Sequence, residues 1–212
     1  MTNTLMIKPE DVKQLREQTG AGIMDCKRAL TESGGDYDKA VLWLREKGLS
    51  TAAKKAGRAA REGIVQSYIH HGSRLGVLLE LNCETDFVAR TEDFQQLARE
   101  LAMQIAGMAP QYVSREDVPA EVIEEQRRLF TVDAERDGRP ADRMPMIVDG
   151  KLNKWLEAVC LLEQPYRDTD RKVGDLVTEK VALLGENIRV ARFVRMAVGE
   201  TASADADADQ AG

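Results

Sequence analysis

The chain has 212 residues, enough for one ordinary domain with a small appended module. Its 43% hydrophobic and 31% charged residues are typical of a globular protein, and a formal net charge of −6 argues against general binding to a phosphate backbone. Three cysteines without a CxxC pair favour a reducing compartment, and no apolar run approaches the ~18 residues that a membrane helix needs, so we expect a cytoplasmic protein.

The first part of the chain predicts three short helices. Pro9 suits the first turn of one helix, and Ile23 begins the apolar stripe of a second. Asp36 is a good N-cap for a third helix, which Gly48 is expected to end. Because short helices are stable only when they pack on one another, we expect a compact three-helix module over residues 1–49.

Met24 lies off the apolar stripe of the second helix, near Lys27. It is either a methionine at the margin of the core or an adaptable apolar contact for a partner, since a thioether side chain suits both roles. The periodicity leaves both interpretations open.

Residues 50–62 are rich in alanine and carry the basic side chains Lys54, Lys55, Arg58 and Arg61. A nucleic-acid-binding patch is one interpretation, and steeply salt-dependent binding to RNA would identify it. No aromatic residues lie between these charges to stack on bases. We therefore favour a solvated, basic helical linker.

From Gly63 the apolar period becomes that of strands. Residues 64–69 and 75–81 predict two strands joined by a turn, which is a β-hairpin. The turn contains His70 and His71. Adjacent residues of an extended chain point to opposite sides, so we do not expect a zinc site there.

The hairpin leads into a polar loop that contains Phe87. Thr91 is a plausible N-cap for the next helix, whose apolar residues recur from Phe94 to Ile105. The loop therefore lies between two rigid elements. Phe87 either folds back into the core or is a preformed wedge offered to a partner, and the local pattern does not distinguish these alternatives.

Three more helices and a late strand follow. We expect helices that begin at Pro119 and Pro145, the latter ending at residues 164–165, and a last helix that Gly185 ends. A strand over residues 188–198 then places Val190, Val194 and Met196 on one face. This order predicts an α+β core domain over residues 63–199, with helices on one face of a small antiparallel sheet, and a disordered acidic tail over residues 200–212.

The sequence contains no P-loop, no dinucleotide-binding glycine motif, no zinc-protease motif and no nucleophile elbow. Cys83 with His70 or His71 could form a thiol–imidazole pair, but nothing marks a third orienting group. Thiol-specific labelling with an activity screen would test that alternative. We expect a binding protein rather than an enzyme, without a catalytic residue, cofactor or metal site.

Three ordered blocks of sequence resemble the bacterial elongation factor Ts family. They comprise residues 12–30, then 67–70, 74–77 and 82–89, and finally 185–192. The resemblance covers roughly residues 8–199. It implies an N-terminal module of the ubiquitin-associated type and a protein that binds the GTPase elongation factor Tu in its GDP form, so that GDP leaves and GTP can load.

The resemblance also implies site residues. In the family, the Thr-Asp-Phe-Val stretch is associated with dislodging magnesium from the GTPase, and here it is Thr85, Asp86, Phe87 and Val88. Further partner contacts are implied at Arg16, Ile23, Met24, Lys27, His70, Leu184 and Gly185.

One departure from the longer family members concerns assembly. Longer members carry two related core halves, whereas the hairpin and the Thr-Asp-Phe-Val loop occur once in this chain. The resemblance therefore implies a homodimer, in which two exchange-factor chains serve two GTPases.

Overall fold

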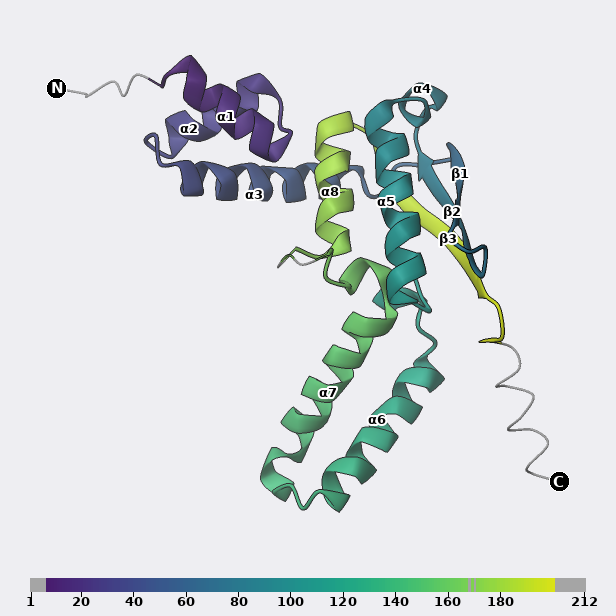
Figure 1. Cartoon of the computed structure of the whole chain (residues 1–212). Coiled ribbons are helices and arrows are strands. Elements are labelled where there is room, and N and C mark those ends of the chain that lie inside the picture. The colour runs from purple at the N-terminus through teal and green to yellow at the C-terminus, as the bar shows by residue number, and fades with distance from the viewer. Residues whose placement is uncertain (1–6, 168, 170, 201–212) are drawn as a thin grey trace. The chain divides into compact units, whose positions relative to one another are not determined.

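The computed structural model describes residues 7–167, 169 and 171–200 (Figure 1). This part of the chain forms two compact units. The first unit contains the described residues up to Gly63, Asn82–Gln95 and Val177–Arg189, and the second contains Ile64–Leu81, Gln96–Leu176 and the described residues from Val190 onward. None of the described helices has both the length and the apolar character needed to span a bilayer. The predicted acidic tail lies outside the described residues, except for Glu200.

The N-terminal part of the first unit contains the three predicted helices. They are α1 (Pro9–Thr19), α2 (Ile23–Glu32) and α3 (Tyr37–Lys55). Pro9 occupies the first turn of α1, and the Asp36 carboxylate caps α3 by accepting a hydrogen bond from the backbone N–H of Lys39 at 3.1 Å. A shared core joins the helices, formed by Val12, Leu15, Cys26, Ala29, Leu30 and Ala40. The likeness to a ubiquitin-associated module stays a prediction.

The prediction that Gly48 ends the third helix is wrong. Helix α3 continues to Lys55, so it crosses the predicted module boundary after residue 49 and includes half of the predicted linker. Gly48 is buried, and a Cβ atom built there would lie 3.7 Å from the Cβ of Ala182 in helix α8 (Val173–Leu184). The small residue therefore serves the close approach of two helices rather than a helix stop.

This contact predicts the effect of Gly48→Ala. A separation of 3.7 Å is ordinary van der Waals contact, so the methyl group fits, and alanine loses less backbone entropy than glycine on folding. We expect the free energy of unfolding to rise by about 0.5–1 kcal/mol in urea titrations. Gly48→Leu is the contrasting variant, because its larger side chain cannot fit and should destabilise the protein. A loss of stability in Gly48→Ala would show that a methyl group does not fit at this contact.

The sheet has the strand order β1-β2-β3, formed by β1 (Glu62–Ile69), β2 (Leu75–Cys83) and β3 (Arg189–Ala197). The predicted hairpin is confirmed, since the N–H of His70 donates to the carbonyl of Leu75 at 2.8 Å. Strand β2 buries one side, formed by Val77, Leu79 and Leu81. Helix α5 (Glu92–Met108) lies along this side and buries Leu97, Leu101 and Ile105 (Figure 1).

The last strand places Val190, Val194 and Met196 on one face, as predicted, because they are separated by even numbers of residues. Val190, near the start of the strand, is buried, whereas Val194 and Met196 are exposed on the outer face of the sheet. Phe193 and Arg195 lie on the opposite face, and the Arg195 Nε donates to the carbonyl of Ala106 at 3.3 Å. The outer face of the sheet therefore carries apolar side chains that no described helix of this unit covers.

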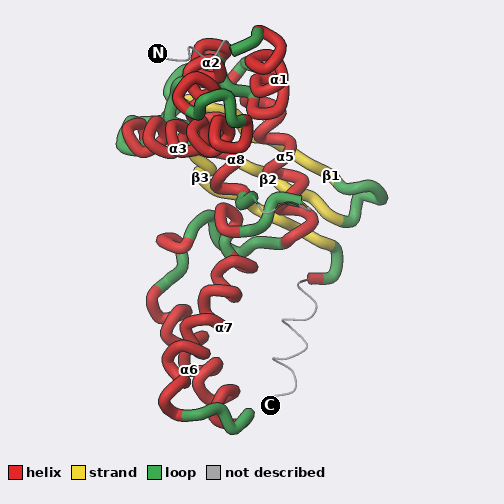
Figure 2. The backbone as a smooth tube through the Cα atoms, turned by 90° about the vertical axis from the view of Figure 1, so that its left-hand side faces the viewer, coloured by secondary structure: helices red, strands yellow, loops and turns green. Residues whose placement is uncertain are grey.

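A helical hairpin belongs to the second unit. Helices α6 (Ala120–Arg136) and α7 (Met144–Val159) lie side by side (Figure 1) and overlap in the view turned by 90° (Figure 2). The core of the hairpin is formed by Val118, Leu152, Leu156, Val159 and Cys160. The predicted start points at Pro119 and Pro145 are close to the observed ones. Helix α7 ends at Val159, before the predicted residues 164–165, because Cys160 is extended and a short 3-10 helix follows over Leu161–Glu163. Two other 3-10 turns cover Arg115–Asp117 and Ala141–Arg143.

The described residues combine helices with a small antiparallel sheet, so the predicted α+β fold class is confirmed.

Candidate functional site

The predicted loop contains a single helical turn, α4 (Asp86–Ala89). Thr85 is its N-cap, and its hydroxyl oxygen accepts a hydrogen bond from the backbone N–H of Val88 at 3.4 Å. Ala89 is buried. Residues two apart on a helix differ by about 200° in direction, so a turn that buries Ala89 presents Phe87 to solvent.

Phe87 is 78% exposed. The core alternative is therefore wrong for this side chain. A phenylalanine at the tip of a capped turn, between a strand and a long helix, is a preformed apolar projection. Its exposure marks a surface that can bind a partner.

Asp86 occupies the first turn of α4 and is paired with Arg90, whose Nη2 lies 2.8 Å from the Asp86 carboxylate. Both side chains are substantially exposed, at 47% and 76%. An exposed pair of this kind contributes about 0–1 kcal/mol. A partner can therefore release the carboxylate at small cost.

The predicted contacts at Leu184 and Gly185 lie at the end of helix α8. Gly185 has a φ of +75°, which ends the helix as predicted. Its carbonyl accepts a hydrogen bond from the Lys55 Nζ at the end of α3. The following residue, Glu186, accepts hydrogen bonds from the loop that precedes α4, so the structure brings this turn and the Phe87 loop together.

The predicted N-terminal contacts lie on the outside of the three-helix module. Met24 is 70% exposed, and Lys27 and Arg16 are also exposed. The structure therefore decides against Met24 as a core residue. Ile23 was expected to begin the apolar stripe of its helix, but it is 56% exposed, because it occupies the first turn beyond the packed stripe. Ile23 and Met24 together form a small apolar patch beside Lys27.

His70 belongs to the second unit, whereas the other predicted contact residues belong to the first. It is exposed in the hairpin turn, and its Nδ1 is 2.9 Å from the hydroxyl of Tyr68. His71 is exposed beside it. Among the described residues, no group of three or more histidine, cysteine or acidic side chains could hold a metal ion.

The thiol-enzyme alternative is not supported by Cys83. Burial, with a smaller contribution from the Glu186 carboxylate, raises the pKa of the Cys83 thiol to about 11. The thiol donates a hydrogen bond to the carbonyl of Thr85 at 3.1 Å. A buried thiol that is protonated at neutral pH is a poor nucleophile, so Cys83 has a structural role at the end of β2.

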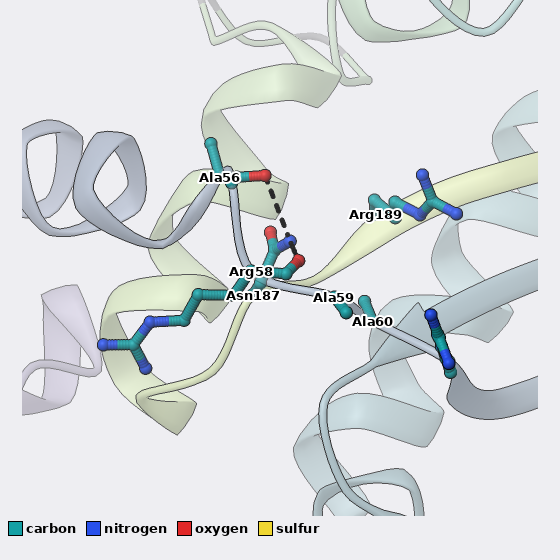
Figure 3. Close-up of a pocket in the computed structure, with 8 residues that line it drawn as sticks. Ala56, Arg58, Ala59, Ala60, Asn187 and Arg189 are labelled. Atoms are coloured by element: carbon teal, nitrogen blue, oxygen red, sulfur yellow. Dashed lines mark hydrogen bonds between the residues drawn. The ribbon is translucent and has the colours of Figure 1, made fainter.

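The nucleic-acid alternative is weakened at the basic stretch. A hollow of about 310 Å³ is lined by residues 56–61, Asn187 and Arg189 (Figure 3). The side chains of Arg58 and Arg189 extend from it in different directions (Figure 3), and Arg58 lies 3.6 Å from the Glu84 carboxylate. The arginines therefore do not converge on one anion.

Comparison with known proteins places these features in a family. Residues 39–200 match the family described as Elongation factor TS. The chain is 57% identical over 196 residues to elongation factor Ts of Carboxydothermus hydrogenoformans, covering 92% of this chain and 90% of that protein. It is 58% identical over 190 residues to that of Coprothermobacter proteolyticus, covering 89% and 96% of the two chains. For Fervidobacterium nodosum the identity is 51% over 195 residues, with 92% and 99% covered. The chain belongs to the elongation factor Ts family.

Proposed function

We propose that this protein is a guanine-nucleotide exchange factor of translation elongation. It binds elongation factor Tu in the GDP form, displaces the magnesium ion and promotes release of GDP, so that GTP can load. The observation that carries the proposal is the exposed Phe87 on a capped turn, in the stretch by which the chain resembles its family. The protein makes and breaks no covalent bond in this role, needs no cofactor and acts in the cytoplasm.

The mechanism is a competition between two ligands of one GTPase. An exchange factor stabilises a conformation that holds nucleotide and magnesium poorly, and the factor by which it weakens nucleotide binding equals the factor by which nucleotide weakens its own binding. Burial of a phenylalanine side chain contributes roughly 2–3 kcal/mol, and each 1.4 kcal/mol corresponds to about tenfold in affinity. Burial of Phe87 can therefore account for about a hundredfold weakening of nucleotide binding.

Asp86 has a separate role in this proposal. Its carboxylate, released from Arg90, brings a negative charge and acceptor oxygens close to the groups that hold magnesium. Phe87 supplies apolar area, whereas Asp86 disturbs the metal site electrostatically.

The direct test is release of labelled GDP from elongation factor Tu, with and without this protein, at several magnesium concentrations. We expect the release rate to rise with the concentration of the protein, and the stimulation to be largest when magnesium is abundant. A release rate that does not depend on the protein would disprove the proposed function.

The N-terminal patch gives a second test of the partner surface. Met24 and Lys27 are exposed, so Met24→Ala with Lys27→Ala should leave helix content unchanged, since alanine is a strong helix former. We expect the dissociation constant for elongation factor Tu·GDP to rise by about tenfold, from lost apolar burial and charge. Calorimetric titration measures the affinity, and circular dichroism measures the helix content.

A matched control for this variant is Met146→Ala with Lys154→Ala. It removes an exposed methionine and an exposed lysine from helix α7 instead. Wild-type affinity in the Met24 and Lys27 variant, or an equal loss in both variants, would show that the N-terminal patch is not a specific contact.

We also propose that the protein is a homodimer that forms a 2:2 complex with the GTPase. Two observations support this proposal: the hairpin and its loop occur once in the chain, and the outer face of the sheet exposes Val65, Ile69, Leu78, Val194 and Met196. A self-complementary apolar face is suited to a two-fold interface.

A further inference from the structure

Glu186 joins two segments that are far apart in the sequence. One of its carboxylate oxygens accepts hydrogen bonds from the backbone N–H groups of Glu84 and Thr85, each at 3.0 Å. The other oxygen accepts a hydrogen bond from the Thr85 hydroxyl at 2.6 Å. Hydrogen bonds to a charged acceptor are stronger than those between neutral groups. The carboxylate thus satisfies three donors at the start of the Phe87 loop.

The connection is reciprocal. The Glu84 carboxylate accepts a hydrogen bond from the backbone N–H of Asn187 at 2.7 Å. The Asn187 side-chain amide donates in turn to the carbonyls of Ala56 and Arg58, at 3.4 and 2.8 Å (Figure 3). Three segments of the first unit therefore converge: the chain after α3, the loop before α4 and the turn after α8.

The Thr85 hydroxyl links this network to the projecting turn. It donates its proton to Glu186, and its oxygen accepts a hydrogen bond from the N–H of Val88. Because the hydrogen of the Thr85 hydroxyl points toward Glu186, a lone pair of the hydroxyl oxygen is available to the N–H of Val88. The N-cap of α4 therefore depends on Glu186.

A helical turn as short as α4 does not form on its own, because the conformational entropy lost in fixing its backbone exceeds the stabilisation from its few hydrogen bonds. Its order must come from its surroundings. Ala89 anchors one end of α4, and the Thr85 cap held by Glu186 anchors the other. Phe87 lies between these two anchors.

We propose that Glu186 is a positioning residue that holds α4, and with it Phe87, in the conformation that binds the partner. It also joins the predicted contacts at Leu184 and Gly185 to the Phe87 loop as one preorganised surface. Preorganisation raises affinity by reducing the entropy lost on binding. This inference rests on the proposed exchange function for its activity readout, but not for its structural readout.

The structural test needs no partner. Amide hydrogen exchange by NMR is compared in the wild type, Glu186→Gln and Glu186→Ala. In Glu186→Ala we expect the amides of Thr85 and Val88 to exchange at least tenfold faster. The Thr85 amide loses its acceptor, and the Val88 amide loses the fixed orientation of its acceptor, the Thr85 hydroxyl. The amide of Leu79, in the core of β2, should keep its rate, so that global unfolding is distinguished from loosening of the loop.

Two further variants sharpen this test. Glu186→Gln keeps a carbonyl acceptor without the charge, so its exchange rates should lie between those of the wild type and Glu186→Ala. Glu46→Ala, which removes an exposed glutamate of α3 outside this network, should behave as the wild type. Unchanged exchange at Thr85 and Val88 in Glu186→Ala would overturn the proposal, whatever the activity of the protein.

The functional test is a double-mutant cycle with Phe87, measured as the rate of GDP release at exchange-factor concentrations well below saturation, where a loss of affinity lowers the rate. We expect Glu186→Ala to lower the release rate about five- to tenfold, and Glu186→Gln to recover part of it. If Glu186 acts through Phe87, then Glu186→Ala with Phe87→Ala should be no slower than Phe87→Ala alone. Fully additive losses would show that Glu186 acts independently of Phe87 and would overturn the proposal. A wild-type protein without exchange activity would instead disprove the proposed function, and the hydrogen-exchange result would still decide the role of Glu186.

Discussion

Phe87→Ala is expected to slow GDP release from elongation factor Tu by roughly tenfold or more, while the free energy of unfolding changes by less than about 0.5 kcal/mol. The two effects separate because the side chain is 78% exposed in the free protein, so its truncation leaves no cavity. Its apolar area is removed from water only when the partner binds. The measurements are urea unfolding of the variant and GDP release at saturating exchange factor.

Phe94→Ala is the matched control. Phe94 lies seven positions further along the same unit and is fully buried in α5. Its truncation should cost about 3–5 kcal/mol of stability, through the cavity that it leaves. A Phe87→Ala variant that is destabilised as strongly as Phe94→Ala, yet retains its exchange activity per folded molecule, would disprove the projecting role of Phe87.

The sequence pattern predicted the frame around Phe87 but not its direction. Alternation in β2 and helical spacing in α5 are local signals, and both elements occur where they were expected. Helix α4 is too short to show a periodicity, so the sequence could not indicate which of its residues is buried. The direction of Phe87 depends on Ala89 and on Glu186, which lies 101 positions from Thr85.

Gly48 and Ile23 show the same limit in the N-terminal module. Glycine is a common helix stop, but Gly48 lies inside α3, where it approaches Ala182 of α8, and no local pattern reveals this contact. Ile23 fits the apolar period, but at the first turn of α2 it lies beyond the packed stripe. Glu186 was within a block that resembles the family, yet only its hydrogen bonds distinguish it from the neighbouring polar residues.

The proposed dimer predicts a large effect of charge on the outer face of the sheet. Leu78 lies on the central strand and is 54% exposed on that face, where the Ile69 side chain of β1 lies close to Gly76 of β2. Leu78→Lys should leave the single chain folded, because the new ammonium group can reach water. In a two-fold interface the same change places two like charges between apolar surfaces, and desolvation of each costs several kcal/mol.

Light scattering at micromolar concentration should therefore give about twice the chain mass of 23.6 kDa for the wild type and about the chain mass for Leu78→Lys. Leu129→Lys is the matched control, since Leu129 is 48% exposed on helix α6, away from the sheet. A wild-type protein that is monomeric would contradict the dimer. If Leu129→Lys dissociates the dimer while Leu78→Lys does not, the two chains associate through the helical hairpin, and the outer face of the sheet is free to bind another partner.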